Sequence, residues 1–265
     1  VWWTGSDWSR HIAEAADVDG HGEAIAAAEE AACRVNAPYV VDGEATPEGV
    51  ELQTGAEPTW SVIWLHGLGA DGHDFEPIVP ELVRQGWPAI RFVFPHAPVR
   101  PVTINGGIPM RAWYDIRSLE LSQRADEAGV RESIDTVRAL VARENARGVP
   151  TQRIVLAGFS QGGAIVLSAA LRHQERFAGV VALSTYLPMP EQAVAEASGA
   201  NKGLPVFWGH GTADPIVPLA LGAQSRDVLE TLGHPVQWHT YPMPHSVSPA
   251  EIRDLADWFE QRFKA

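Results

Sequence analysis

The chain has 265 residues, of which 45% are apolar and 20% charged, and this composition excludes a wholly disordered protein. A single cysteine, Cys33, excludes an intrachain disulfide and a zinc site that needs two or more cysteines. The formal net charge of −13 disfavours nucleic-acid binding, which needs a basic surface, and electrostatic docking on anionic lipid. No apolar run reaches the length of a membrane span, so we expect no stable membrane insertion.

Residues 1–50 differ from the rest of the chain in charge. They contain ten acidic and two basic residues, and so account for −8 of the net charge of −13. The Ala- and Glu-rich stretch from Ser9 to Asn36 is typical of a helix, and a short strand is predicted at Tyr39–Val41. We therefore expect an acidic, mainly helical N-terminal extension over residues 1–50, followed by a larger domain over residues 51–265. The extension either covers a site, forms an oligomer arm, or packs on the surface as an appendage.

The first residues show no secretory signal. Val1 is followed by neither a basic region nor an apolar stretch, and we therefore expect a cytoplasmic protein. Trp2, Trp3 and Trp8 lie in the same segment. Because indole rings are unfavourable in water, we expect part of this segment to dock on the protein.

After residue 50, short apolar runs alternate with amphipathic helical patterns. The predicted strands are Ser61–Leu65, Ala89–Phe94, Ile154–Ala157, Gly179–Leu183, Val206–Trp208 and Val236–Tyr241. The predicted helices are Arg131–Arg147, Ala164–His173, Leu219–Leu232 and a last helix with Ser248 as cap, Pro249 in its first turn and Glu251 completing a capping box. This alternation predicts an α/β fold with a mostly parallel twisted sheet and helices on both faces.

The segment Gly158-Phe159-Ser160-Gln161-Gly162 matches the pattern G-x-S-x-G. It follows a predicted strand and leads into a predicted helix, which is the context that a nucleophile elbow requires. The turn forces the serine into a strained conformation, and its neighbours two residues away must be small. Ser160 is therefore the candidate nucleophile; the alternative is a glycine-rich turn that carries an incidental serine.

A serine hydroxyl needs a base within hydrogen-bond reach, and the base needs an orienting carboxylate. In α/β hydrolases these residues follow in the order Ser, acid, His. Asp214 and His245 follow the last two predicted strands and fit this order, because open α/β sheets keep their sites at the carboxyl ends of strands. His210 is a rival to His245, but its place at the end of a strand favours a structural role.

A tetrahedral intermediate needs hydrogen-bond donors for its oxyanion. We expect the backbone N–H groups of Gln161, which follows the nucleophile, and of Leu68, in the loop after the first predicted strand. This loop also matches G-x-G-x-x-G, so a dinucleotide site is the alternative. Such a site needs an acidic residue about 20 positions further on, and residues 87–96 contain none. His66 is expected to be structural and to fix the loop.

With these segments in place, the chain resembles the carboxylesterase, acyl-protein thioesterase and lysophospholipase family of α/β hydrolases from about residue 58 onward. The matching blocks are LHGLGADGHDF (Leu65–Phe75), FPHAPVRPVTINGG (Phe94–Gly107), WYDI (Trp113–Ile116), GFSQGG (Gly158–Gly163), ALSTYLP (Ala182–Pro188), HGTADPIVP (His210–Pro218) and MPHSVSPAEI (Met243–Ile252). Among these blocks, the segments TINGG and STYLP most resemble those of bacterial carboxylesterases. Residues 1–50 match nothing known in the family.

The resemblance implies an α/β-hydrolase fold over residues 51–265 and the triad Ser160, Asp214 and His245. It also makes Pro95–Tyr114 the substrate loop, with Ile104, Met110 and Trp113 lining an acyl pocket, although ordinary loop packing would equally explain these three residues. We expect a serine carboxylesterase that hydrolyses short- to medium-chain acyl esters without metal or cofactor. The alternatives are an acyl-protein thioesterase or lysophospholipase acting on long acyl chains, and a catalytically silent binding module. The expected partner is a small-molecule ester. The sequence does not determine the oligomeric state, and a homodimer is one of the alternatives.

Overall fold

A sheet of eight strands forms the centre of the protein in its computed structural model, which describes residues 33–41, 44–118 and 126–264. The spatial order is β1-β2-β4-β3-β7-β8-β9-β10, and the six strands from β4 to β10 run parallel. The strands are β1 (Cys33–Val41), β2 (Glu44–Gln53), β3 (Trp60–Leu65), β4 (Ile90–Pro95), β7 (Ile154–Phe159), β8 (Gly179–Leu183), β9 (Val206–Gly211) and β10 (Val236–Tyr241).

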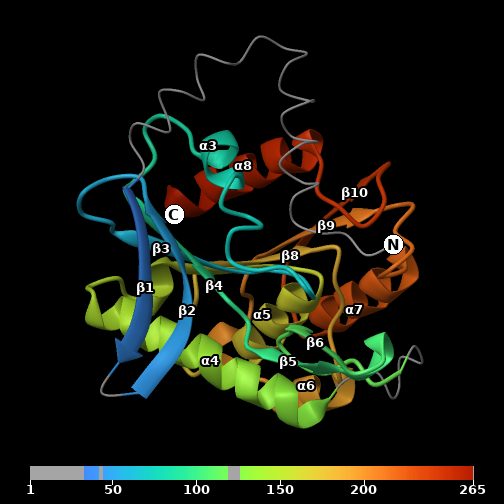
Figure 1. Cartoon of the computed structure of the whole chain (residues 1–265). Helices are drawn as coiled ribbons and strands as arrows, with labels where there is room; N and C mark the ends of the chain where they lie inside the picture. Colours follow the sequence, from blue (N-terminus) through green and yellow to red (C-terminus); the bar gives the residue numbers. More distant parts are fainter. Residues whose placement is uncertain (1–32, 42–43, 119–125, 265) are drawn as a thin grey trace.

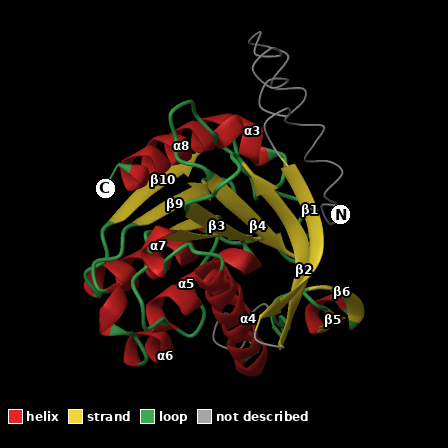
Figure 2. Ribbon diagram, turned by 90° about the vertical axis from the view of Figure 1, so that its left-hand side faces the viewer, coloured by secondary structure: helices red, strands yellow, loops and turns green. Residues whose placement is uncertain are grey.

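Helices cover both faces of this sheet (Figure 1). One face carries α4 (Glu127–Ala146), α5 (Gln161–Arg172), α6 (Pro190–Ala195) and α7 (Leu219–Thr231), and the other carries α3 (Ile78–Leu82) and α8 (Pro249–Phe263). The same two layers are seen on either side of the sheet in Figure 2. Because both faces are covered, β7 and β8 are continuous apolar runs, and Arg91 is the one charged residue in β4. The prediction of a mostly parallel α/β fold is confirmed.

The two N-terminal strands, β1 and β2, differ from the prediction. Strand β1 pairs antiparallel with β2, and β2 pairs antiparallel with β4. The predicted helix over Ser9–Asn36 is therefore wrong for residues 33–36, whereas the predicted strand at Tyr39–Val41 is part of β1. Strand β2 crosses the expected boundary at residue 50. An Asp-Gly dipeptide between two runs with β-branched residues is a hairpin signal that the sequence offered. The remainder of the predicted helix lies outside the described residues.

A buried charged cluster ties α4 to the sheet. The Glu144 carboxylate on α4 is fully buried and accepts hydrogen bonds from Ser61 Oγ on β3 at 2.6 Å and from Arg91 Nη1 on β4 at 2.7 Å. Glu51 on β2 accepts from Arg147 Nη1 and Nη2 at 2.9 and 3.0 Å. A buried carboxylate is tolerated only when it is paired in this way. The cluster thus holds α4 against three neighbouring strands.

A hairpin interrupts the connection between β4 and α4. Strands β5 (Val99–Val102) and β6 (Ile108–Arg111) pair antiparallel and form a separate two-stranded sheet. Gly106 and Gly107 in its turn have φ of 68° and 79°, which only glycine adopts without strain. The predicted substrate loop is therefore an ordered hairpin over much of its length.

Helix α8 begins as predicted, with Ser248 Oγ accepting a hydrogen bond from Glu251 N at 3.2 Å and Pro249 in the first turn. The Glu251 carboxyl is buried and packs on the backbone of Gly209 in β9, where a Cβ atom would overlap it. Burial raises the pKa of Glu251 to about 8, and the Ser248 backbone N–H offsets the rise only in part. The carboxyl is therefore protonated in the folded protein at neutral pH.

We predict that Glu251→Gln makes folding stability less sensitive to pH. Between pH 4.5 and 8 the wild-type carboxyl is protonated when folded and ionised when unfolded, so the free energy of unfolding falls as pH rises across this window. Glutamine cannot ionise, and the stability of the variant relative to wild type should improve by up to about 3 kcal/mol between pH 5 and pH 8. Urea unfolding at a series of pH values measures this difference.

The matched control is Glu57→Gln, because Glu57 is exposed just before β3. Its stability relative to wild type should stay constant across the same pH range. A constant difference for Glu251→Gln as well would show that Glu251 is ionised in the folded state.

Candidate active site

The three predicted triad residues lie at one edge of the sheet. Ser160 follows β7, Asp214 follows β9 and His245 follows β10. Because these strands are parallel, their carboxyl ends meet at the same edge, and residues that are far apart in sequence become neighbours.

Ser160 occupies a strained turn between β7 and α5. Its φ of 54° and ψ of −118° are unfavourable for any residue with a Cβ atom. A Cβ atom at Gly158 would lie 2.6 Å from Gly163 N, and one at Gly162 would lie 2.6 Å from His66 O and still closer to Leu65 O. The glycines of the pattern thus allow the start of α5 to approach both the end of β3 and the end of β7.

Contacts from the end of β8 hold the turn in place. Ser160 N donates to Leu183 O at 2.9 Å, and Thr185 Oγ1 donates to Ser160 O at 2.6 Å. The methyl and hydroxyl groups of Thr185 also lie where a side chain at Gly163 would be. Sequence reasoning missed Thr185, although the block STYLP that contains it was a signal.

The hydroxyl, imidazole and carboxylate form one hydrogen-bonded line. His245 Nε2 lies 2.9 Å from Ser160 Oγ, and His245 Nδ1 lies 2.7 Å from Asp214 Oδ2. The His245 side chain is 16% exposed and that of Asp214 is fully buried. The ring of Phe159 packs 4.7 Å from the His245 ring, centroid to centroid. The imidazole is thus held between a carboxylate and the serine, with one side open to solvent.

Asp214 is held as a carboxylate. Burial raises the pKa of Asp214, but the hydrogen bond and charge of His245 and the backbone N–H groups of Val217 and Ile216 outweigh burial, so that the pKa of Asp214 is lowered overall. Oδ1 accepts from Ile216 N at 2.8 Å and from Val217 N at 2.9 Å, which leaves Oδ2 for the imidazole. The loop after β9 therefore fixes both the charge and the orientation of the carboxylate.

His210, the rival base, has a structural environment. Its ring is fully buried, and its Nε2 lies 2.8 Å from Val217 O. Burial lowers the pKa of His210, so the ring is neutral. The side chain supports the loop that carries Asp214, and the structure places His245 rather than His210 next to the serine.

The loop after β3 lies beside the start of α5. Among the residues that the structure describes, the backbone N–H groups of Leu68 and Gln161 donate to no protein acceptor. Gly69, with φ of 80°, turns its N–H toward Arg111 O in the hairpin at 2.8 Å. The loop leads to a helix only at Ile78, and a side chain at Gly72 would clash with Phe94 O. The glycines therefore serve close packing, which disfavours the dinucleotide alternative.

His66 fixes this loop, as predicted. Its Nε2 accepts a hydrogen bond from Ala97 N at 3.0 Å, and its Nδ1 donates to Gly67 O at 2.7 Å. Burial lowers the pKa of His66 to about 4, so the ring is neutral and can accept at Nε2.

The three residues expected to line an acyl pocket divide into two groups. Trp113 is fully buried, and its Nε1 donates to His66 O at 2.9 Å. The Gln161 side chain bridges to this segment, accepting from Trp113 N at 2.8 Å. The indole is thus a part of the core that supports the loop, and its burial favours the alternative of ordinary loop packing for this residue. Ile104 and Met110 are partly exposed, and Met110 Sδ lies 3.9 Å from the Cβ position of Gly69.

No group of three or more His, Cys, Asp or Glu side chains within residues 33–41, 44–118 and 126–264 could hold a metal ion. In the same residues, no helix has the length and apolar character needed to cross a membrane.

The fold and the site together define an α/β hydrolase. The model of the phospholipase/carboxylesterase family matches residues 50–262, and the chain belongs to this family. A second family model, described only as a protein of unknown function, matches residues 1–57.

Curated relatives support the same assignment. The chain is 41% identical to acyl-protein thioesterase 1 of Cryptococcus neoformans over 223 residues, which cover 78% of this chain and 93% of the relative. It is also 41% identical to acyl-protein thioesterase 1 of Mycosarcoma maydis, over 80% of this chain and 95% of the relative. These relatives carry the name of a thioesterase rather than that of a short-chain carboxylesterase.

Solved structures agree with the fold. The crystal structure of Arabidopsis thaliana SOBER1 has a TM-score of 0.73 and 30% identity, and the match covers 77% of this chain and 98% of the other. Acyl-protein thioesterase 2 of Zea mays has a TM-score of 0.71 and 26% identity, with 81% and 99% covered. The chain is thus a hydrolase of a family that acts on acyl esters.

We predict that Gly162→Ala damages both the fold and the site. The added methyl group would press on Leu65 O and His66 O and would move the loop after β3 away from α5. Overpacking against backbone atoms should lower the free energy of unfolding by about 3 kcal/mol or more, and the displaced loop should also lower kcat. Chemical unfolding and ester-hydrolysis rates measure the two effects.

Gly199→Ala is the control, because a Cβ atom at Gly199 meets nothing within 4 Å and its φ is not positive. That variant should stay within about 0.5 kcal/mol of wild type. Wild-type stability in Gly162→Ala would contradict the close approach of α5 to β3.

Proposed function

We propose that the protein is a serine hydrolase that cleaves long-chain acyl thioesters and acyl esters through an acyl-enzyme on Ser160. The observation that carries the proposal is the hydrogen-bonded line from Asp214 through His245 to Ser160, with contacts of 2.7 and 2.9 Å. This geometry meets the requirement that a nucleophile and its base lie within hydrogen-bond reach and that a third group orients the base.

In the first step, Ser160 Oγ attacks the acyl carbonyl carbon while His245 Nε2 takes the hydroxyl proton. The Asp214 carboxylate orients the imidazole and stabilises the imidazolium that forms. The carbonyl oxygen becomes an oxyanion and accepts hydrogen bonds from the Leu68 and Gln161 N–H groups, which have no competing protein acceptor in the described chain. The tetrahedral intermediate then expels the thiol or alcohol, which leaves with the proton from His245.

In the second step, water takes the place of the leaving group. His245 removes a proton from the water, whose oxygen attacks the acyl carbonyl and forms a second tetrahedral intermediate in the same oxyanion site. Ser160 Oγ leaves with the proton, and a carboxylic acid is released. All proton transfers use chain residues and water.

The relatives favour the thioesterase over the short-chain carboxylesterase. The matched relatives from two fungi are named acyl-protein thioesterases. The hairpin beside the oxyanion loop carries partly exposed apolar side chains at Ile104 and Met110, and Ile108 is 61% exposed. We propose that Ile104 and Met110 contact the acyl chain and that Trp113 supports the loop from within the core.

We predict that Ser160→Ala lowers kcat on a p-nitrophenyl ester by on the order of 10⁴-fold or more, because the acyl-enzyme cannot form. The same change should abolish labelling by a fluorophosphonate. Steady-state kinetics and labelling of the purified full chain measure both effects.

Ser168→Ala is the matched control, at a serine within helix α5, which Ser160 immediately precedes. The Ser168 hydroxyl is buried and has no hydrogen-bond partner in the described structure, so its loss should leave activity close to wild type. Wild-type turnover in Ser160→Ala would remove the proposed mechanism.

We predict that kcat/KM rises with acyl length in a series of butyryl, octanoyl and palmitoyl thioesters. Each buried methylene group contributes about 0.8 kcal/mol, so even partial burial should favour octanoyl over butyryl by about tenfold or more. Met110→Ala should reduce kcat/KM for palmitoyl more than for butyryl, because only the long chain reaches beyond the oxyanion loop.

Oxygen esters of the same acids complete the comparison. If kcat/KM is highest for the butyryl substrates and Met110→Ala does not change this, the protein is a short-chain carboxylesterase.

A further inference from the structure

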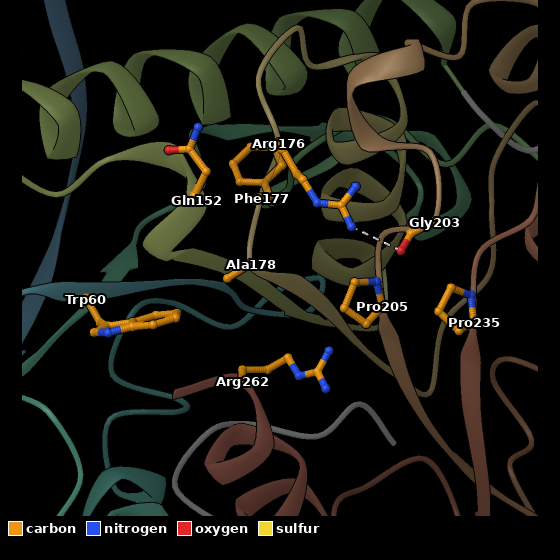
Figure 3. Close-up of a pocket in the computed structure, with 9 residues that line it drawn as sticks. All are labelled: Trp60, Gln152, Arg176, Phe177, Ala178, Gly203, Pro205, Pro235 and Arg262. Atoms are coloured by element: carbon orange, nitrogen blue, oxygen red, sulfur yellow. Dashed lines mark hydrogen bonds between the residues drawn. The ribbon is translucent and has the colours of Figure 1, made fainter. Parts of the chain in front are cut away.

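A pocket of about 460 Å³ lies away from the candidate active site (Figure 3). Its volume is within the range of small-molecule sites. Most of its wall is apolar, and two arginines and one glutamine add polar groups. The lining residues are Trp60, Gln152, Arg176, Phe177, Ala178, Gly203, Pro205, Pro235 and Arg262.

The pocket is at the amino ends of the parallel strands, whereas Ser160 is at their carboxyl ends. Trp60 begins β3, Ala178 immediately precedes β8, and Pro205 and Pro235 immediately precede β9 and β10. These positions are the amino ends of parallel strands, whereas the triad residues follow the carboxyl ends of β7, β9 and β10. A ligand in this pocket would therefore not occupy the position of the acyl substrate.

Two guanidinium groups reach the pocket from different elements. Arg176 precedes β8, and its Nη1 and Nη2 donate to the carbonyl oxygens of Lys202 and Gly203 at 2.8 and 3.3 Å. Arg262 is in the last turn of α8, and its Nε is buried and has no hydrogen-bond partner in the part of the chain that the structure describes. Figure 3 shows the two side chains entering from opposite sides of the pocket.

Neither arginine has a carboxylate partner within the described residues. Other arginines of this acidic chain, such as Arg84, Arg91 and Arg172, pair with glutamate or aspartate. Arg262 lies over the Trp258 ring, 5.6 Å from the guanidinium carbon to the ring centroid, which stabilises the cation but supplies no acceptor. The guanidinium remains charged, so the pocket holds positive charge with which no carboxylate of residues 33–41, 44–118 and 126–264 forms an ion pair.

We propose that this pocket binds a small organic anion whose phosphate or carboxylate group is held by Arg176 and Arg262 and whose apolar body packs against Trp60, Phe177 and Pro205. A guanidinium presents several N–H donors in a plane that matches the oxygens of these anions. The aromatic ring and the prolines would exclude water from the other side of the ligand.

Isothermal titration of the full chain with 1-naphthyl phosphate tests the proposal, because this probe combines a phosphate with an apolar ring system. We expect saturable binding below about 1 mM. Arg262→Gln and Arg176→Gln should each weaken binding by about tenfold or more, since each removes a charge-assisted contact. Inorganic phosphate and 1-naphthol, which each lack half of the proposed ligand, should bind at least about tenfold more weakly.

Two controls separate this site from the rest of the molecule. Arg253→Gln changes an exposed arginine on the same helix and should leave binding unchanged. Ser160→Ala should also bind the probe as wild type does, because the pocket is at the other edge of the sheet. Ester hydrolysis by Arg262→Gln and Arg176→Gln should stay at the wild-type rate, which shows that both variants fold.

Absence of saturable binding would overturn the proposal. So would binding that both arginine variants retain at wild-type strength, or binding that is lost when a fluorophosphonate occupies Ser160, because the probe would then be bound elsewhere.

Discussion

The start of helix α5 lies against the ends of β3 and β7 more closely than any side chain would permit, and the geometry of the site depends on this contact. Gly158 and Gly162 supply the space, and Ser160 takes up the backbone strain at φ of 54°. Strain of this kind persists only where the surroundings enforce it, here through the backbone of β8 and the Thr185 hydroxyl. The same approach brings the N–H of Gln161 beside the loop that carries Leu68, so one packing contact positions both the proposed nucleophile and the proposed oxyanion donors.

Burial decides the charge of the groups around this contact. His66 and His210 are neutral because desolvation lowers the pKa of each, and both use their rings to support loops. Asp214 keeps its charge in spite of burial because His245 and two backbone N–H groups compensate for the lost water. For Glu251, the backbone hydrogen bond at Ser248 offsets burial only in part, and the carboxyl is protonated. The carboxyl groups of Asp214 and Glu251 thus differ in charge according to the donors that face them.

The parallel sheet separates two kinds of chemistry. Its carboxyl edge carries the groups proposed for acyl transfer, and its amino edge carries the pocket with Arg176 and Arg262. Because the strands between them are almost completely buried, a ligand at one edge has no direct path to the other. The proposed anion site is therefore distant from the proposed acyl-transfer site, and the two can be tested independently.

The sequence by itself determined the parallel α/β sheet, the cap of α8 and the positions of Ser160, Asp214 and His245, because apolar runs, glycines and loop residues at strand ends are local patterns. Tertiary structure alone decided what depends on distant partners. The pairing of β1 and β2 with β4 needed a sheet edge to receive them, and Trp113 became a buried support because Gln161 and His66 bond to it. Arg176 and Arg262 are 86 positions apart, and no local pattern relates them. The hydrophobic periodicity of a sequence indicates which face of a helix or strand is buried, but not which residues of another element pack against that face.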